Sequence, residues 1–99
     1  MIDKKKIIEL ISEIKTELGS KYGFKSIILY GSFAKDKGSK DSDIDIAVEV
    51  DDTHKTWKNY IAAKDDLKSL LGHEIDLVYL DSMNPIIKNN IEEYKVEIE

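Results

Sequence analysis

The stretch "IILYGSFAKDKGSKDSDIDIAV" (residues 27–48) holds two apolar runs on either side of a polar, charged loop. The first run belongs to "KSIILYG" (25–31), which is rich in branched side chains and ends at Gly31, as is typical of an interior strand. The second run predicts a strand from about Ile44 to Val50, entered through alternating aspartates at positions 43 and 45. The stretch therefore predicts two strands joined by a short connection.

The segments on either side predict helices and two further strands. An amphipathic helix is expected from about Asp3 to Leu18, with Gly19 as its stop signal. Residues 52–72 predict a second helix that is capped by Asp52 or Thr53, ends at Gly72, and packs Trp57 and Tyr60 on the sheet. The rest predicts a strand, a short helix and an edge strand: "EIDLVYL" (74–80), "NPIIKNNIEEY" (84–94) and "KVEIE" (95–99). This order indicates an α/β (α+β) fold, in which helices cover a small mixed β-sheet of about four strands.

Composition limits the class of protein. A length of 99 residues suits one domain spanning residues 1–99. No apolar run approaches the roughly 20 residues that cross a bilayer, and the N-terminal segment lacks the apolar core of a secretory signal, so no membrane partner is expected. The absence of cysteine fits a reducing compartment, and we expect a cytoplasmic protein. A net charge of -5 argues against direct binding along a nucleic-acid backbone.

Asp43 and Asp45 stand two positions apart, so an extended chain directs both carboxylates to one face of the sheet. At a separation of about 5 Å and an effective dielectric constant near 20, their repulsion is on the order of 3 kcal/mol. A bound cation would remove this cost. Mg²⁺ suits such a site because it takes carboxylate oxygens together with substrate phosphates. The pair therefore predicts a metal site and a phosphate-bearing substrate.

Two neighbouring features extend this site. Asp76 lies alone in an apolar strand, and it completes a triad of metal-binding carboxylates if that strand runs beside the second one. Three carboxylates could hold one or two Mg²⁺ ions, as in-line nucleotidyl transfer requires. Gly31 and Ser32 end the first strand and offer backbone amides and a hydroxyl to a phosphate, and Lys35 could add positive charge.

A calcium loop is a competing interpretation, because Asp41, Asp43 and Asp45 have EF-hand-like spacing. It fails because Ile46 occupies the position that needs glycine and the flanks predict a loop and a strand instead of helices. The Walker pattern of nucleotide-binding loops is absent as well. His54 and His73 are expected to be a helix-start residue and a loop residue without a catalytic role.

Taken together, "GSFAKDKGSKDSDID" (31–45) contains Gly-Ser, ten intervening residues and Asp-x-Asp, followed later by "EIDLV" (74–78). This pattern resembles the signature of the DNA polymerase β-like nucleotidyltransferase superfamily, and the short chain is similar to its minimal, antitoxin-type branch. The resemblance implies the polymerase β-like fold and Mg²⁺-dependent transfer from ATP. It also implies that Asp43, Asp45 and Asp76 are catalytic metal ligands, and that Gly31 and Ser32 hold the triphosphate.

The resemblance further implies a partner. Members of the minimal branch are commonly antitoxins of HEPN-type toxins, and several transfer AMP to a tyrosine of the toxin, so a complex with such a partner is expected. One alternative is a non-catalytic, nucleotide-binding antitoxin subunit that neutralises its partner by binding alone. Another is modification of a small molecule, which we expect to need an additional acceptor-binding domain.

Overall fold

Four strands form one mixed sheet in the computed structural model, which describes residues 2–99. The strands are β1 (Phe24–Tyr30), β2 (Ile44–Val50), β3 (Ile75–Tyr79) and β4 (Val96–Glu97), and their order in the sheet is β3-β2-β1-β4. β1 runs antiparallel to both β2 and β4, whereas β2 and β3 are parallel. The predicted α/β class and mixed four-stranded sheet are confirmed, with the last strand at an edge as expected.

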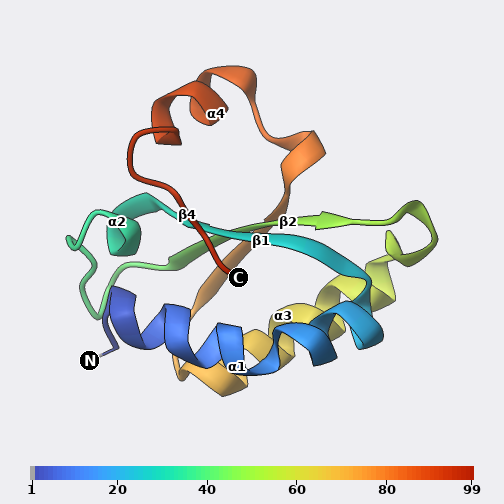
Figure 1. Cartoon of the computed structure of the whole chain (residues 1–99). Helices are drawn as coiled ribbons and strands as arrows, with labels where there is room; N and C mark the ends of the chain where they lie inside the picture. The colour runs from blue at the N-terminus through green and yellow to red at the C-terminus, as the bar shows by residue number, and fades with distance from the viewer. Residues whose placement is uncertain (1) are drawn as a thin grey trace.

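Two long helices, α1 (Lys4–Tyr22) and α3 (Trp57–Leu71), lie together against one face of this sheet (Figure 1). Side chains two apart in a strand share a face, so alternate residues of β1 and β2 point toward these helices. The helices cover them, and they are fully buried. Those residues are Ile27, Leu29, Ile44, Ile46 and Val48. The short helix α4 (Pro85–Ile91) lies on the opposite side, so most of the core is between the sheet and the α1/α3 layer.

Two predicted helix boundaries are wrong. α1 does not stop at Gly19 but continues for one more turn, because Tyr22 is buried in the core and Gly23 supplies the left-handed backbone (φ 74°) that ends the helix. The residues after β2 form a short 3-10 turn, Asp52–His54, instead of the start of α3. Thr56 is the actual cap, and its hydroxyl accepts a hydrogen bond of 3.1 Å from the Asn59 amide.

The prediction that Trp57 packs on the sheet is also wrong. Its side chain is 76% exposed and stacks on the outer side of Tyr60, with ring centroids 5.7 Å apart. Tyr60 does pack against the core, and its hydroxyl donates a hydrogen bond of 2.6 Å to the Leu77 carbonyl. Helical spacing placed both rings on one side of α3, but Trp57 is the first residue of the helix and its ring remains exposed to solvent.

No described helix is long and apolar enough to span a membrane.

Candidate functional site

Asp45 and Asp76 occupy directly paired positions on the neighbouring strands β2 and β3. The adjacency on which the predicted triad depended is therefore confirmed. Both carboxylates lie on the sheet face away from α1 and α3, because the alternating residues of the same strands fill the core. Asp45 is partly buried and Asp76 is exposed.

The two carboxylates are electrostatically coupled. Burial raises the pKa of Asp45 to about 6, with further contributions from the charge of Asp76, from hydrogen bonding to Asp76 and from the charge of Asp43. Burial also raises the pKa of the neighbouring Tyr30 phenol to about 12, and the charges of Asp45 and Asp76 add to this effect. Negative charge is therefore unfavourable at Asp45, mainly because the side chain is partly buried and secondarily because Asp76 lies beside it.

The Gly31 turn lies against Asp45. Tyr30, the last residue of β1, pairs with Asp45 across the antiparallel ladder, and the single-turn helix α2 (Gly31–Ala34) follows at once. Gly31 has φ 74°, and a Cβ atom there would lie 2.7 Å from Asp45 Cγ. Only glycine allows the backbone to approach the carboxylate this closely. The structure thus brings the predicted phosphate-binding turn into contact with Asp45, one of the three predicted metal ligands.

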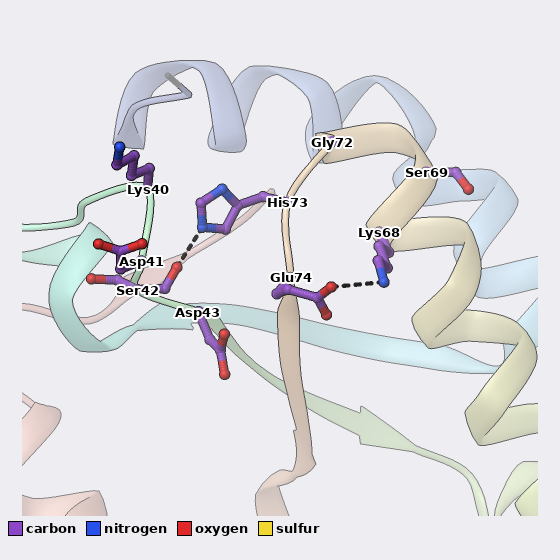
Figure 2. Close-up of a pocket in the computed structure, with 9 residues that line it drawn as sticks. All are labelled: Lys40, Asp41, Ser42, Asp43, Lys68, Ser69, Gly72, His73 and Glu74. Carbon is purple, nitrogen blue, oxygen red and sulfur yellow. Dashed lines mark hydrogen bonds and ion pairs between the residues drawn. The ribbon is translucent and has the colours of Figure 1, made fainter.

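Asp43 precedes β2 and is exposed. Figure 2 shows its carboxylate directed away from His73, toward the sheet face opposite α1. Asp43 lines a separate pocket of about 550 Å³ between its loop and the end of α3. It does not line the pocket that contains Asp45 and Asp76. Its charge still contributes to the raised pKa of Asp45.

His73 connects the loop that carries Asp43 to the Gly31 turn. Its Nε2 hydrogen-bonds to the Ser42 carbonyl, which can only accept, so Nε2 carries the proton (Figure 2). The other side of the imidazole meets the Phe33 ring of α2 edge-on, at a centroid distance of 5.2 Å. Next to it, the Ile44 amide donates to the Glu74 carbonyl at 2.9 Å. The expectation of a plain loop residue missed this bridging position, because only the fold brings residues 33, 42 and 73 together.

The ten residues between Ser32 and Asp43 are packed instead of trailing into solvent. Gly38 lies on the Phe33 ring, since a Cβ atom at position 38 would lie 2.6 Å from Phe33 Cε1. Ser39 and Ser42 then close a turn in which the Ser42 amide donates to the Ser39 carbonyl at 3.0 Å. The loop therefore has a defined path from the Gly31 turn to Asp43.

Lys35 lies apart from the carboxylate pair. Its ammonium group is 4.4 Å from the centre of the Tyr94 ring, its side chain is exposed, and it does not line the pocket that contains Asp45 and Asp76. Ser32 is partly exposed within the turn, directly after Gly31. Of the three predicted nucleotide-binding residues, Gly31 touches Asp45 and Ser32 follows it, whereas Lys35 contacts the C-terminal segment.

An open pocket of about 600 Å³ contains Asp45 and Asp76 and is lined by three tyrosines, Tyr30, Tyr60 and Tyr79. Tyr60 and Tyr79 meet edge-on with centroids 5.9 Å apart. Sequence reasoning missed Tyr30 and Tyr79 as pocket residues. A signal was present for Tyr30, because the residue immediately before Gly31 must lie beside whatever the turn holds.

The chemistry of the carboxylates fits a hard divalent cation such as Mg²⁺, because oxygen ligands converge where their ionised forms repel one another. Within residues 2–99, however, no three aspartate, glutamate or histidine side chains already stand together as a formed metal-binding group. Asp45 and Asp76 are in register on neighbouring strands, whereas Asp43 precedes β2 and lines a different pocket.

Comparison with known proteins places this geometry in a family. The model for the "Nucleotidyltransferase domain" family matches residues 11–98. The chain belongs to the nucleotidyltransferase family. A provisionally named protein adenylyltransferase of Methanocaldococcus jannaschii is 38% identical to it over 89 residues, covering 88% of this chain and 89% of that protein. The resemblance to minimal nucleotidyltransferases that the sequence motifs indicated is therefore confirmed.

Solved structures agree with the fold of this nucleotidyltransferase. A structure described as a minimal nucleotidyltransferase superposes with a TM-score of 0.78 at 22% identity, covering 96% of this chain and 95% of that one. A second structure contains a tri-AMPylated HEPN toxin of Shewanella oneidensis in complex with MNT antitoxin. It matches with a TM-score of 0.67 at 23% identity, covering 97% of this chain and 71% of that one. At these identities the likeness is one of fold.

Proposed function

We propose that this nucleotidyltransferase is an antitoxin that transfers AMP from ATP to a tyrosine hydroxyl of a partner HEPN-type toxin, and that residues 1–99 act as one catalytic domain. The observation that carries the proposal is the Asp45–Asp76 pair set directly against the Gly31 turn. Support for the acceptor class comes from the protein adenylyltransferase name of the M. jannaschii relative and from the AMPylated toxin in the structural neighbour.

In the proposed reaction, the acceptor hydroxyl attacks the α-phosphorus of ATP. A new oxygen–phosphorus bond forms, the bond to the bridging oxygen breaks, pyrophosphate leaves with the electron pair, and the hydroxyl proton passes to Asp76 or to water. Gly31 and Ser32 hold the triphosphate through their backbone amides and the Ser32 hydroxyl, and Lys35 adds positive charge at the edge of the turn.

Asp43, Asp45 and Asp76 would hold one or two Mg²⁺ ions. When bound, Mg²⁺ neutralises charge on the phosphates and favours ionisation of the attacking hydroxyl. By holding the ion, the carboxylates would position the triphosphate relative to the acceptor, and the raised pKa of Asp45 marks it as the residue whose charge most needs a counter-ion.

The test is a transfer assay with α-labelled ATP, Mg²⁺ and the cognate HEPN-type toxin. We expect the wild-type chain to label the toxin. Asp45→Asn should lower the rate by on the order of 100-fold or more, because it removes a charge from the centre of the site. Asp41→Asn, in an exposed aspartate of the preceding loop, is the matched control and should retain activity.

Two results would contradict the proposal. If Asp45→Asn still labels the toxin at the wild-type rate, the carboxylate pair is not the catalytic centre. If the wild type labels nothing but still neutralises the toxin, and Asp45→Asn neutralises it equally well, the chain is a binding antitoxin without transferase activity.

A further inference from the structure

Large apolar side chains are exposed at only four positions in residues 2–99, and all four lie on α3 or α4. They are Trp57 (76% exposed), Ile61 (38%), Ile86 (69%) and Ile87 (46%). An exposed tryptophan and a pair of adjacent isoleucines are costly to leave in water and commonly mark a contact surface. We call Trp57 and Ile61 the α3 ridge, and Ile86 and Ile87 the α4 ridge.

Both ridges border the pocket that contains Asp45 and Asp76. Ile87 of the α4 ridge lines that pocket directly. Trp57 and Ile61 line an adjoining hollow of about 420 Å³, which shares the rings of Tyr60 and Tyr79 with the pocket. The carboxylate pair therefore lies between two apolar ridges. Binding of a nucleotide alone does not require exposed apolar side chains on both sides of the pocket. A protein surface that reaches across the pocket would cover the α3 ridge and the α4 ridge together.

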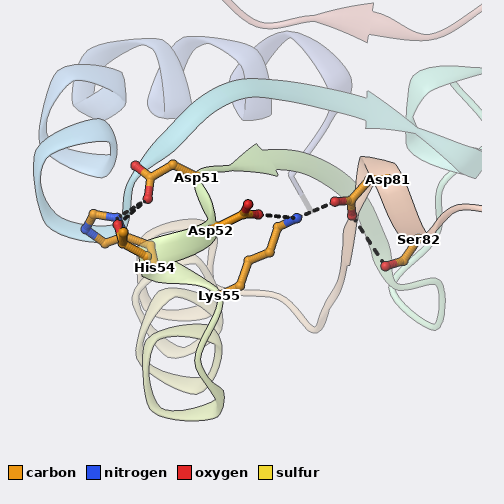
Figure 3. A network of polar contacts seen from close by, with 7 residues as sticks. Asp51, Asp52, His54, Lys55, Asp81 and Ser82 are labelled. Carbon is orange, nitrogen blue, oxygen red and sulfur yellow. Dashed lines mark hydrogen bonds and ion pairs between the residues drawn. The ribbon is translucent and has the colours of Figure 1, made fainter.

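The ridges carry positive charge in an acidic chain. Residues 53–64 contain three lysines and residues 83–91 contain one, and neither segment has an acidic residue, although the net charge of the chain is -5. Lys55 is paired with Asp52 and Asp81 (Figure 3). Lys58 and Lys64 make no ion pair with any residue of the described range 2–99, so their charges are available to a partner. Lys88 instead faces a separate hollow that it lines together with acidic residues such as Asp52 and Asp81.

We infer that the α3 and α4 ridges form the docking surface for the acceptor protein, whose contacting face is apolar and carries carboxylates opposite Lys58 and Lys64, away from the hydroxyl that receives AMP. This inference rests on the proposed function for the identity of the acceptor. A two-fold dimer through the same face would set the lysines of one copy against those of the other, which is unfavourable. The surface thus fits an acidic partner better than a second copy of the chain.

Trp57 provides a direct probe because it is the single tryptophan of the chain. The full chain labelled with 5-fluorotryptophan has one ¹⁹F resonance, which should shift and broaden when the cognate HEPN-type toxin is added. Trp57→Ser and Ile86→Ser should each weaken toxin binding and raise the KM for toxin by about tenfold or more, as truncation of central apolar contacts does. The KM for ATP should not change. Glu13→Ser, exposed on α1 and outside both ridges, is the control and should behave as wild type.

The outcomes separate docking from catalysis. If AMP is transferred while the ¹⁹F resonance does not move and both serine variants keep the wild-type KM for toxin, the docking surface is refuted and the proposed function stands. If no AMP is transferred but the resonance shifts and both variants lose the complex, docking is supported and the catalytic role falls. A shift that depends on the concentration of the chain alone would identify a second copy as the occupant and overturn the inference.

Discussion

Replacing Asp45 with asparagine should stabilise the metal-free protein at neutral pH. The substitution keeps the shape of the side chain but removes a charge that is disfavoured first by burial and then by the charges of Asp76 and Asp43. The pKa of Asp45 rises from 3.8 to about 6, a difference of about 2 units, and each unit corresponds to about 1.4 kcal/mol. The resulting upper limit is roughly 3 kcal/mol. Because Asp45 is only partly buried and Asp76 is exposed, solvent screening reduces the expected gain to about 1 kcal/mol.

The sign of the effect depends on pH. A carboxyl group whose pKa is higher in the folded state destabilises the fold only when ionised, so its cost is absent below the unfolded pKa of 3.8 and complete above about pH 6. We therefore expect Asp45→Asn to raise the Tm by about 4–8 °C at roughly pH 7.5. The difference should shrink toward zero near pH 4, where the wild-type carboxyl group is already protonated.

Thermal unfolding in a chelating buffer, followed by circular dichroism at both pH values, measures this difference. Asp41→Asn is the control for a general reduction of negative charge. An equal or lower Tm for Asp45→Asn at pH 7.5, or a gain that persists unchanged at pH 4, would refute the argument that the carboxylates repel one another. Excess Mg²⁺ should reverse the order by stabilising the wild type more than the variant, since a cation that binds only the folded state adds to its stability.

Three other substitutions test the architecture around the pair. Gly31→Ala should cost about 1–3 kcal/mol in urea unfolding, because the new Cβ atom would meet Asp45 at a backbone angle unfavourable for alanine. His73→Phe retains an aromatic ring beside Phe33 but loses the hydrogen bond to Ser42, which holds the loop that carries Asp43. The variant should need about tenfold more Mg²⁺ for half-maximal transfer, with little change in the KM for ATP. Thr56→Ala should lower the free energy of unfolding by about 1 kcal/mol through loss of the α3 cap, whereas Thr56→Ser should cost much less.

Periodicity was sufficient to predict the order of the elements, because continuous apolar runs and three- to four-residue spacings are local properties of the chain. Boundaries depended on tertiary contacts. Gly19 looks like a helix stop in the sequence, yet the burial of Tyr22 extends α1 to Gly23. Trp57 has the spacing of a core residue, but whether the sheet reaches as far as the first turn of α3 is not a local property.

For the site, the alternation of residues predicted that Asp43 and Asp45 point to one face, and the fold then placed Asp76 in register with Asp45. The position of Lys35 against Tyr94 could not be predicted, because the C-terminal segment returns beside α2 only through the pairing of β4 with β1. The same holds for His73. Its contacts with Ser42 and Phe33 join residues far apart in the sequence, and no spacing rule connects them.

The packed path of residues 33–42 has a consequence for changes in chain length. Surface loops usually tolerate insertions and deletions, because the cost of closing a loop changes slowly with its length. Here Gly38 packs on the Phe33 ring. The Ser39–Ser42 turn then places the Ser42 carbonyl where it accepts a hydrogen bond from His73 Nε2. One residue more or fewer would either lift Gly38 from the ring or rotate Asp43 to the other face of the sheet. The ten-residue interval thus fixes the distance between the Gly31 turn and the carboxylates.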